Sequence, residues 1–168
     1  MKKLTIFIIM IFAVSVSLAQ NKKAAAYNNK IIEEQYKVTP YIVKFFKTFE
    51  KGTKEELMNQ KADLIKRIDK AIAKVSKFKD FEGDGSLRDA ALEWFRLYES
   101  SLVKEYDHMI ELISNRDRSK EDHDKLDELA KKLIKEEELL DAKFQKAQEE
   151  FAKRHNLELV EYPVKQIN

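Results

Sequence analysis

The chain has 168 residues, no cysteine, and 32 basic against 30 acidic residues. This length favours one domain, and the lack of cysteine excludes disulfides, so packing must supply the stability. Lys2 and Lys3 account for the formal net charge of +2, and charges of both signs are interspersed along the rest of the chain. That pattern argues against a nucleic-acid binder and against a basic helix on a membrane surface.

The first 19 residues have the layout of a secretory signal peptide. A short positive region is followed by an almost wholly apolar run at residues 4–16, and then by the small residues of Ser17-Leu18-Ala19. The apolar run is short for a permanent membrane span, although an uncleaved anchor stays an alternative. The sequence therefore predicts contact with a membrane only during export.

Cleavage is expected between Ala19 and Gln20, where small residues occupy the positions that a signal peptidase requires. No cysteine follows the cleavage site, so a lipid anchor of the bacterial lipoprotein kind is excluded. We expect a signal peptide at 1–19, a helical domain at 20–156 and an extended tail at 157–168. The mature protein would lie in the periplasm, at the cell surface or outside the cell.

The first helix is expected at about 24–50, because apolar residues recur there at steps of three, four or seven. Pro40 lies inside this pattern, so a kink or a short break is expected near Thr39. Gly52 is expected to end the helix at the position after its last turn. The predicted buried stripe is Ile31, Val38, Ile42, Phe45 and Phe49.

Three more helices are expected, at about 54–77, 86–114 and 120–155. Thr53 and Glu56 have the spacing of a capping box, which marks the start of the second helix. The sequence thus predicts an all-α protein, arranged as an up-down-up-down four-helix bundle with long helices. The seven-residue spacing also permits a coiled-coil-like hairpin and a homodimer.

The loop before the third helix resembles the first half of an EF-hand calcium site. Asp80, Glu82 and Asp84 match ligand positions 1, 3 and 5, and Gly85 matches position 6. Ala91 stands at position 12, where the motif needs a glutamate that supplies two oxygens. The three acidic residues are therefore candidate metal ligands, and a plain turn is the favoured interpretation.

A plain turn accounts for the same residues. Gly83 and Gly85 would allow a left-handed reversal between the helices, and Ser86 with Asp89 would form a capping box. Phe78 and Phe81 would then close the end of the bundle.

Other chemical motifs are sparse. Glu105 and His108 have the spacing of a di-iron half-site, but no second pair exists in the chain, so surface positions are expected for both. The stripe of the fourth helix is interrupted at Glu136 and Glu137, and Lys61 interrupts that of the second. A Glu137–Lys61 pair in the core, joined by Gln35, is predicted, with a functional carboxylate pocket as the alternative.

Motifs for haem attachment, phosphate binding, zinc binding and serine nucleophiles are absent from the sequence. We therefore expect no cofactor, no catalytic residue and no enzymatic activity.

Two motifs carry a resemblance to a known group of proteins. They are F-x-G-D-x-S-L-R-D-A-A-L-x-x-F-x-x-Y at 81–98 and F-x-x-A-Q-x-x-F-A at 144–152. The chain resembles an uncharacterised family of small exported bacterial proteins with all-helical bodies. The resemblance implies export and a helical fold, and it implies no activity or site.

The function that these features predict is binding of a protein or another envelope component by an exported helical bundle. A metal-binding bundle, using Asp80–Asp84 or carboxylates near Glu137, is one alternative. A periplasmic chaperone that holds unfolded chains is the other, and it would require an exposed apolar concavity.

Overall fold

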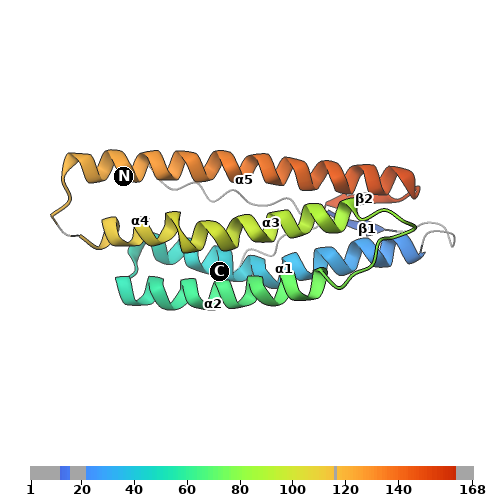
Figure 1. The fold of residues 1–168 in the computed structure, drawn as a ribbon, viewed down its shortest axis with the longest axis horizontal. Helices are drawn as coiled ribbons and strands as arrows, with labels where there is room; N and C mark the ends of the chain where they lie inside the picture. The colour runs from blue at the N-terminus through green and yellow to red at the C-terminus, as the bar shows by residue number, and fades with distance from the viewer. Residues whose placement is uncertain (1–11, 16–21, 116, 162–168) are drawn as a thin grey trace.

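The computed structural model describes residues 12–15, 22–115 and 117–161. The prediction of an all-α fold is confirmed, because helices make up most of this part of the chain (Figure 1). Their long axes lie side by side, and a short ladder of two strands lies near one end. The elements are β1 (Phe12–Ser15), α1 (Lys22–Lys51), α2 (Lys54–Val75), α3 (Ser86–Val103), α4 (Glu105–Ser114), α5 (Lys120–Arg154) and β2 (Glu158–Glu161).

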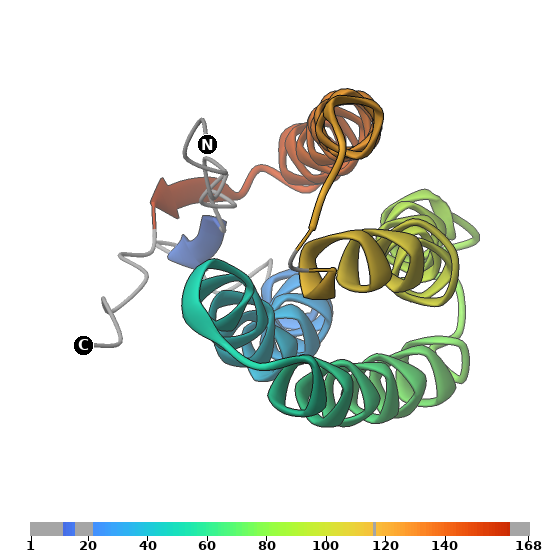
Figure 2. The same ribbon diagram turned by 90° about the vertical axis from the view of Figure 1, so that its left-hand side faces the viewer.

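The helices pack in the order of the chain. α1 packs against α2, α2 against α3, and α3 and α4 against α5, so that α2 and α5 lie on opposite sides of the body (Figure 2). A single apolar core fills the space between them, and it contains the whole predicted stripe of α1. Its largest fully buried side chains are Trp94, Phe45, Phe95, Phe151, Ile31, Leu57, Leu64, Ile68, Leu87, Leu102 and Ile110.

α1 continues through Pro40 without interruption, so the short break considered near Thr39 does not occur. The hydroxyl of Thr39 donates a hydrogen bond to the carbonyl of Gln35 (2.9 Å), a contact that Thr side chains make within helices. Gly52 follows the helix as expected, but its φ is not left-handed. A glycine is needed there because a Cβ would lie 2.8 Å from the carbonyl oxygen of Thr48.

The capping box of Thr53 and Glu56 is confirmed at the start of α2. By contrast, the single helix predicted at 86–114 is divided at Lys104, whose φ of −111° and ψ of −75° separate α3 from α4. One turn earlier the Ser100 hydroxyl donates to the carbonyl of Leu97 (3.0 Å). Such a bond bends helices slightly, but the same kind of bond at Thr39 leaves α1 uninterrupted, so it does not by itself explain the break.

The turn between α2 and α3 differs from the prediction in two respects. Gly83 is left-handed (φ 83°), but Gly85 is not, and Gly85 rather than Ser86 is the N-cap of α3. The predicted capping box of Ser86 and Asp89 is therefore wrong. Asp84 takes over the capping role, because its carboxylate accepts from the Ser86 backbone N–H (2.9 Å).

The strands join the two ends of the described chain. β1 pairs with β2 in an antiparallel ladder and packs against α1. β1 lies within the range predicted to be the signal peptide, and β2 lies within the predicted extended tail. The predicted cleavage site, Ala19 and Gln20, lies outside the described residues, as do residues 162–168. None of the described helices is both long enough and apolar enough to cross a membrane.

Candidate functional site

The loop with the EF-hand-like sequence is held closed by arginines. Arg88 forms ion pairs with Asp80 and Asp89, and its guanidinium also donates to the carbonyl of Phe78 (3.1 Å). Arg154, at the end of α5, forms an ion pair with Asp84. Two of the three predicted metal ligands therefore already have cationic partners, so a cation would have to displace them.

Electrostatics at Asp84 agree with this arrangement. Partial burial opposes ionisation of its carboxyl, but hydrogen bonds from Ser86 and the nearby Arg154 outweigh it and lower the pKa. The third predicted ligand, Glu82, has a positive φ (51°). Its carboxylate lies 3.8 Å from Nδ1 of His155. Within the described part of the chain, no group of three or more His, Cys, Asp or Glu side chains is placed to hold a metal ion.

Gly85 lets this loop close. A Cβ on Gly85 would lie 2.5 Å from the Arg88 guanidinium and 2.7 Å from the Asp80 carboxylate, so the ion pair passes directly over the glycine. Beneath the loop, Phe81 packs its ring edge-on against Phe151 (5.6 Å between centroids). The prediction that Phe78 and Phe81 close this end of the molecule is confirmed, since both rings contact the core.

A layer of polar groups lies inside the body between α5 and the α3–α4 pair. Glu137 of α5 accepts a hydrogen bond from the Tyr106 hydroxyl (3.3 Å), and Asp141, one turn later, accepts from the Trp94 indole N–H (2.7 Å). Tyr98 lies beside Trp94, with 4.6 Å between ring centroids. The two carboxyl groups thus face aromatic donors in an otherwise apolar region.

The pKa values of these groups are displaced together. Burial, with a smaller contribution from the charge of Asp141, raises the pKa of Glu137 to about 7. Burial likewise raises the pKa of Asp141, and it raises those of Tyr98 and Tyr106, whose hydroxyls feel the charge of Glu137. Glu137 can therefore hold or release a proton near neutral pH. Since it is 9% exposed, solvent reaches it only slightly.

The predicted pair of Glu137 with Lys61 is wrong. Lys61 is buried as expected, but it forms its ion pair with Asp107 at the start of α4. The reason is the packing order, because Lys61 is on α2 and Glu137 is on α5, which lie on opposite sides of the body. Gln35, expected in the same layer, is fully buried, and neither of its amide atoms has a hydrogen-bond partner among the residues that the structure describes.

Of the Glu105 and His108 pair, which the sequence predicted to lie on the surface, His108 is exposed and Glu105 is half-buried. Glu105 forms an ion pair with Lys132 of α5 (2.6 Å). Partial burial opposes ionisation of Glu105, but the hydrogen bond and charge of Lys132 lower the pKa overall.

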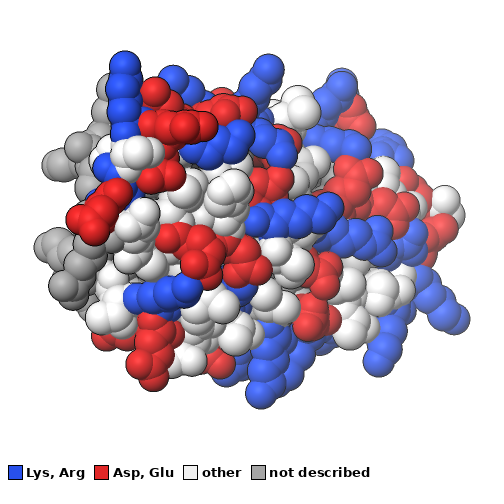
Figure 3. Space-filling view, turned by 60° about the vertical axis from the view of Figure 1, so that its left-hand side comes forward, with Lys and Arg blue, Asp and Glu red and all other residues white. Residues whose placement is uncertain are grey.

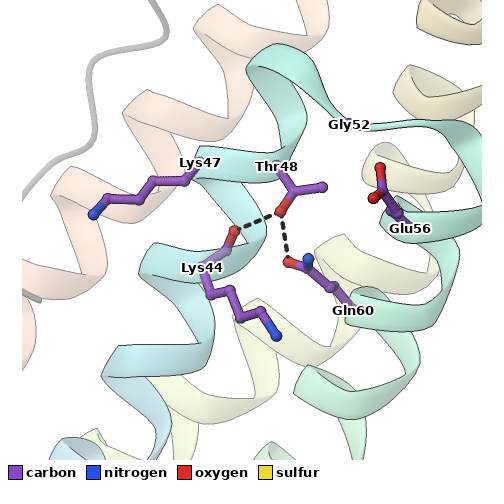
Figure 4. Close-up of a pocket in the computed structure, with 6 residues that line it drawn as sticks. All are labelled: Lys44, Lys47, Thr48, Gly52, Glu56 and Gln60. Atoms are coloured by element: carbon purple, nitrogen blue, oxygen red, sulfur yellow. Dashed lines mark hydrogen bonds between the residues drawn. The ribbon is translucent and has the colours of Figure 1, made fainter. Parts of the chain in front are cut away.

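A surface hollow of about 320 Å³ lies where α1 meets α2 (Figure 4). The Thr48 hydroxyl in its floor lies 2.8 Å from the amide oxygen of Gln60 and 3.0 Å from the carbonyl of Lys44. Its rim carries charges of both signs on exposed side chains. This composition is unlike the apolar, enclosed lining of most small-molecule sites. The lining residues are Lys44, Lys47, Thr48, Gly52, Glu56 and Gln60.

The outer surface repeats the mixed charge of the sequence. On the face shown in Figure 3, Lys and Arg alternate with Asp and Glu, and no large region of one sign appears. Some exposed charges of the molecule pair between helices, such as Lys54 of α2 with Glu111 of α4 (2.6 Å). Exposed ion pairs of this kind add little stability each.

No protein-family model matches the chain, and neither the curated proteins nor the solved structures include a match. The resemblance to small exported helical proteins therefore stays a prediction.

Proposed function

We propose that this is an exported, non-enzymatic helical protein that binds a macromolecular partner at the cell envelope. The signal-peptide pattern at 1–19 supports export. Support for binding comes from α5. The helix has 35 residues, and its first fully buried residue is Leu133.

The partly covered apolar stripe at the start of α5 is the observation that carries the proposal. Leu126, Leu129 and Ala130 lie on one helical face with Leu133, yet they are only half-buried at the edge of the core. An amphipathic helix normally buries its apolar face, and helix-in-groove recognition uses such a partly covered face. We define the Leu126 stripe as Leu126, Leu129 and Ala130, and propose that the partner contacts it.

Site-specific photo-cross-linking in the exporting cell tests this proposal. A photoreactive residue at His123, which is exposed and about 60° around the helix from Leu126, should give a discrete adduct with an envelope component. The matched control is Lys131, which is exposed on the opposite face of the same helix. Equal adducts from both positions, or none from either, would contradict the proposal.

The architecture belongs to the same proposal. We propose an up-down-up-down bundle in which α1 bends at Pro40, since short turns join successive helices and proline bends helices. A homodimer through the Leu126 stripe is the corresponding assembly when the partner is a second copy.

The metal-binding alternative is less favoured. Asp80 and Asp84 form ion pairs with Arg88 and Arg154, and Glu137 accepts a hydrogen bond from Tyr106, so a metal ion would have to compete with these partners. Thermal unfolding of the protein with calcium, zinc or iron, against the same protein in EDTA, tests the alternative, because a ligand of the folded state raises the midpoint.

A further inference from the structure

The ladder of β1 and β2 joins two segments that are remote in the chain. Its register pairs Phe12 with Glu161, Ala13 with Val160, Val14 with Leu159 and Ser15 with Glu158. β1 also packs against α1, so this four-residue strand is hydrogen-bonded along one edge and covered by a helix as well. An isolated pair of strands is marginal in water, so the contact with α1 stabilises the ladder.

β2 also has contacts with α5 that do not involve β1. The backbone N–H of Leu157 donates to the carbonyl of Ala152 (2.9 Å), and Leu157 packs against the core. Asn156, with φ of 49°, reverses the chain between α5 and β2. β1 therefore lies between β2, which contacts α5, and α1.

β1 belongs to the segment that export would remove. Cleavage after Ala19, which is part of the proposed function, takes Phe12–Ser15 away and leaves the N–H and C=O groups along this edge of β2 without partners. An unpaired strand edge next to an apolar helix face is a template for another extended chain. The strand that pairs with β2 has the sequence FAVS, in which three of the four residues are apolar.

We propose that the β2 edge beside α1 is an acceptor site for an extended apolar segment of another polypeptide, which pairs antiparallel to β2 in the place of β1. Main-chain hydrogen bonds to Glu158–Glu161 supply the binding, so recognition tolerates different sequences. The site suits a protein that holds unfolded or extended chains outside the cytoplasm. β1 blocks it until the signal peptide is removed.

The full-length chain allows the test, because β1 can be weakened in place. Ala13→Pro with Val14→Pro removes two successive backbone N–H groups, and one of them points toward β2 in any antiparallel register. The matched control, Ala13→Thr with Val14→Thr, keeps both N–H groups and a high strand preference. The probe is a fluorescent peptide, IFAVSV, which copies residues 11–16 between terminal lysines.

The proline variant should bind this peptide saturably, with at least about tenfold higher affinity than the wild type or the threonine variant. Amide hydrogen exchange at 158–161 should be faster in the proline variant than in the control, and the peptide should slow it again. Equal peptide binding by all three proteins would overturn the proposal, as would its absence from the proline variant. Dimerisation of the proline variant that excludes the peptide would also overturn it, since a second copy would then be the occupant.

These outcomes are separable from failure of the proposed export, because the peptide assay uses purified full-length protein and needs no cleavage. A protein that accepts the peptide but is never processed would refute export and leave the acceptor site intact. A protein that is processed, but whose proline variant does not bind the peptide, would support export and refute the acceptor site.

Discussion

Replacing Glu137 with glutamine should stabilise the protein, and the gain should depend on pH. Glutamine has nearly the same shape as glutamate, and its amide oxygen can still accept the hydrogen bond from Tyr106. What the substitution removes is a carboxyl group that must ionise in a buried position one turn from Asp141. A buried carboxylate without a cationic partner is costly.

The size of the gain follows from the displaced pKa. In the folded protein the pKa of Glu137 is about 7, against 4.5 for the free side chain. The folded state thus keeps a proton that the unfolded state releases, so stability falls as pH rises from 4.5 to 7 and is level above 7. At pH 8 the full cost is about 3 kcal/mol, and at pH 5 it is about 1 kcal/mol.

Chemical denaturation at pH 5 and pH 8 measures this difference. Glu137→Gln should exceed the wild type in free energy of unfolding by about 3 kcal/mol at pH 8, equivalent to roughly 6–12 °C in Tm, and by about 1 kcal/mol at pH 5. The matched control is Glu138→Gln, one residue away on an exposed position, which should change stability little at either pH. A gain that is the same at both pH values, or no gain at pH 8, would refute the reasoning.

Three further tests, each made by substitution, address other parts of the structure. Asp80→Ala with Asp84→Ala breaks the ion pairs with the arginines. It should lower the free energy of unfolding by about 1–2 kcal/mol, equally in EDTA and in millimolar calcium. A loss of stability seen only in calcium would instead support a metal site in this loop. Asp107→Asn leaves the buried Lys61 ammonium without its anion and should cost about 2 kcal/mol in thermal unfolding, whereas Lys61→Met should cost less than about 1 kcal/mol; equal costs would contradict this. Gln35→Met removes a buried amide without partners and should raise stability by about 1 kcal/mol in urea titration, and a loss would mean that the amide is bonded.

Local signals predicted the helices well. The spacing of apolar residues gave the stripe from Ile31 to Phe49, all of it buried, and the Thr53 capping box fixed the start of α2. The break at Lys104 was not predicted, because the apolar spacing continues across it into α4. Only the backbone angles of Lys104 reveal it.

The polar layer was predicted only in part. The gap in the stripe of α5 correctly placed Glu137 at the core, because burial follows from helical periodicity alone. Its partner did not follow, since the packing order of helices decides which side chains meet, and that order placed Lys61 beside Asp107. The hydrogen bond from Trp94 to Asp141 likewise depends on which helices pack together.

The strand pair could not be predicted for a similar reason. Phe12–Ser15 looks like part of an apolar leader, and Glu158–Glu161 looks like a tail, so no short-range pattern connects them. Their pairing depends on α1 and α5 bringing the two ends of the described chain together.

The central claim is that this protein works outside the cytoplasm after its leader has been removed. Intact-mass measurement of the protein from the extracytoplasmic fraction of the producing cell tests the claim most directly. We expect a polypeptide that begins at Gln20. A chain that still begins at Met1, found only in the cytoplasmic fraction, would contradict it.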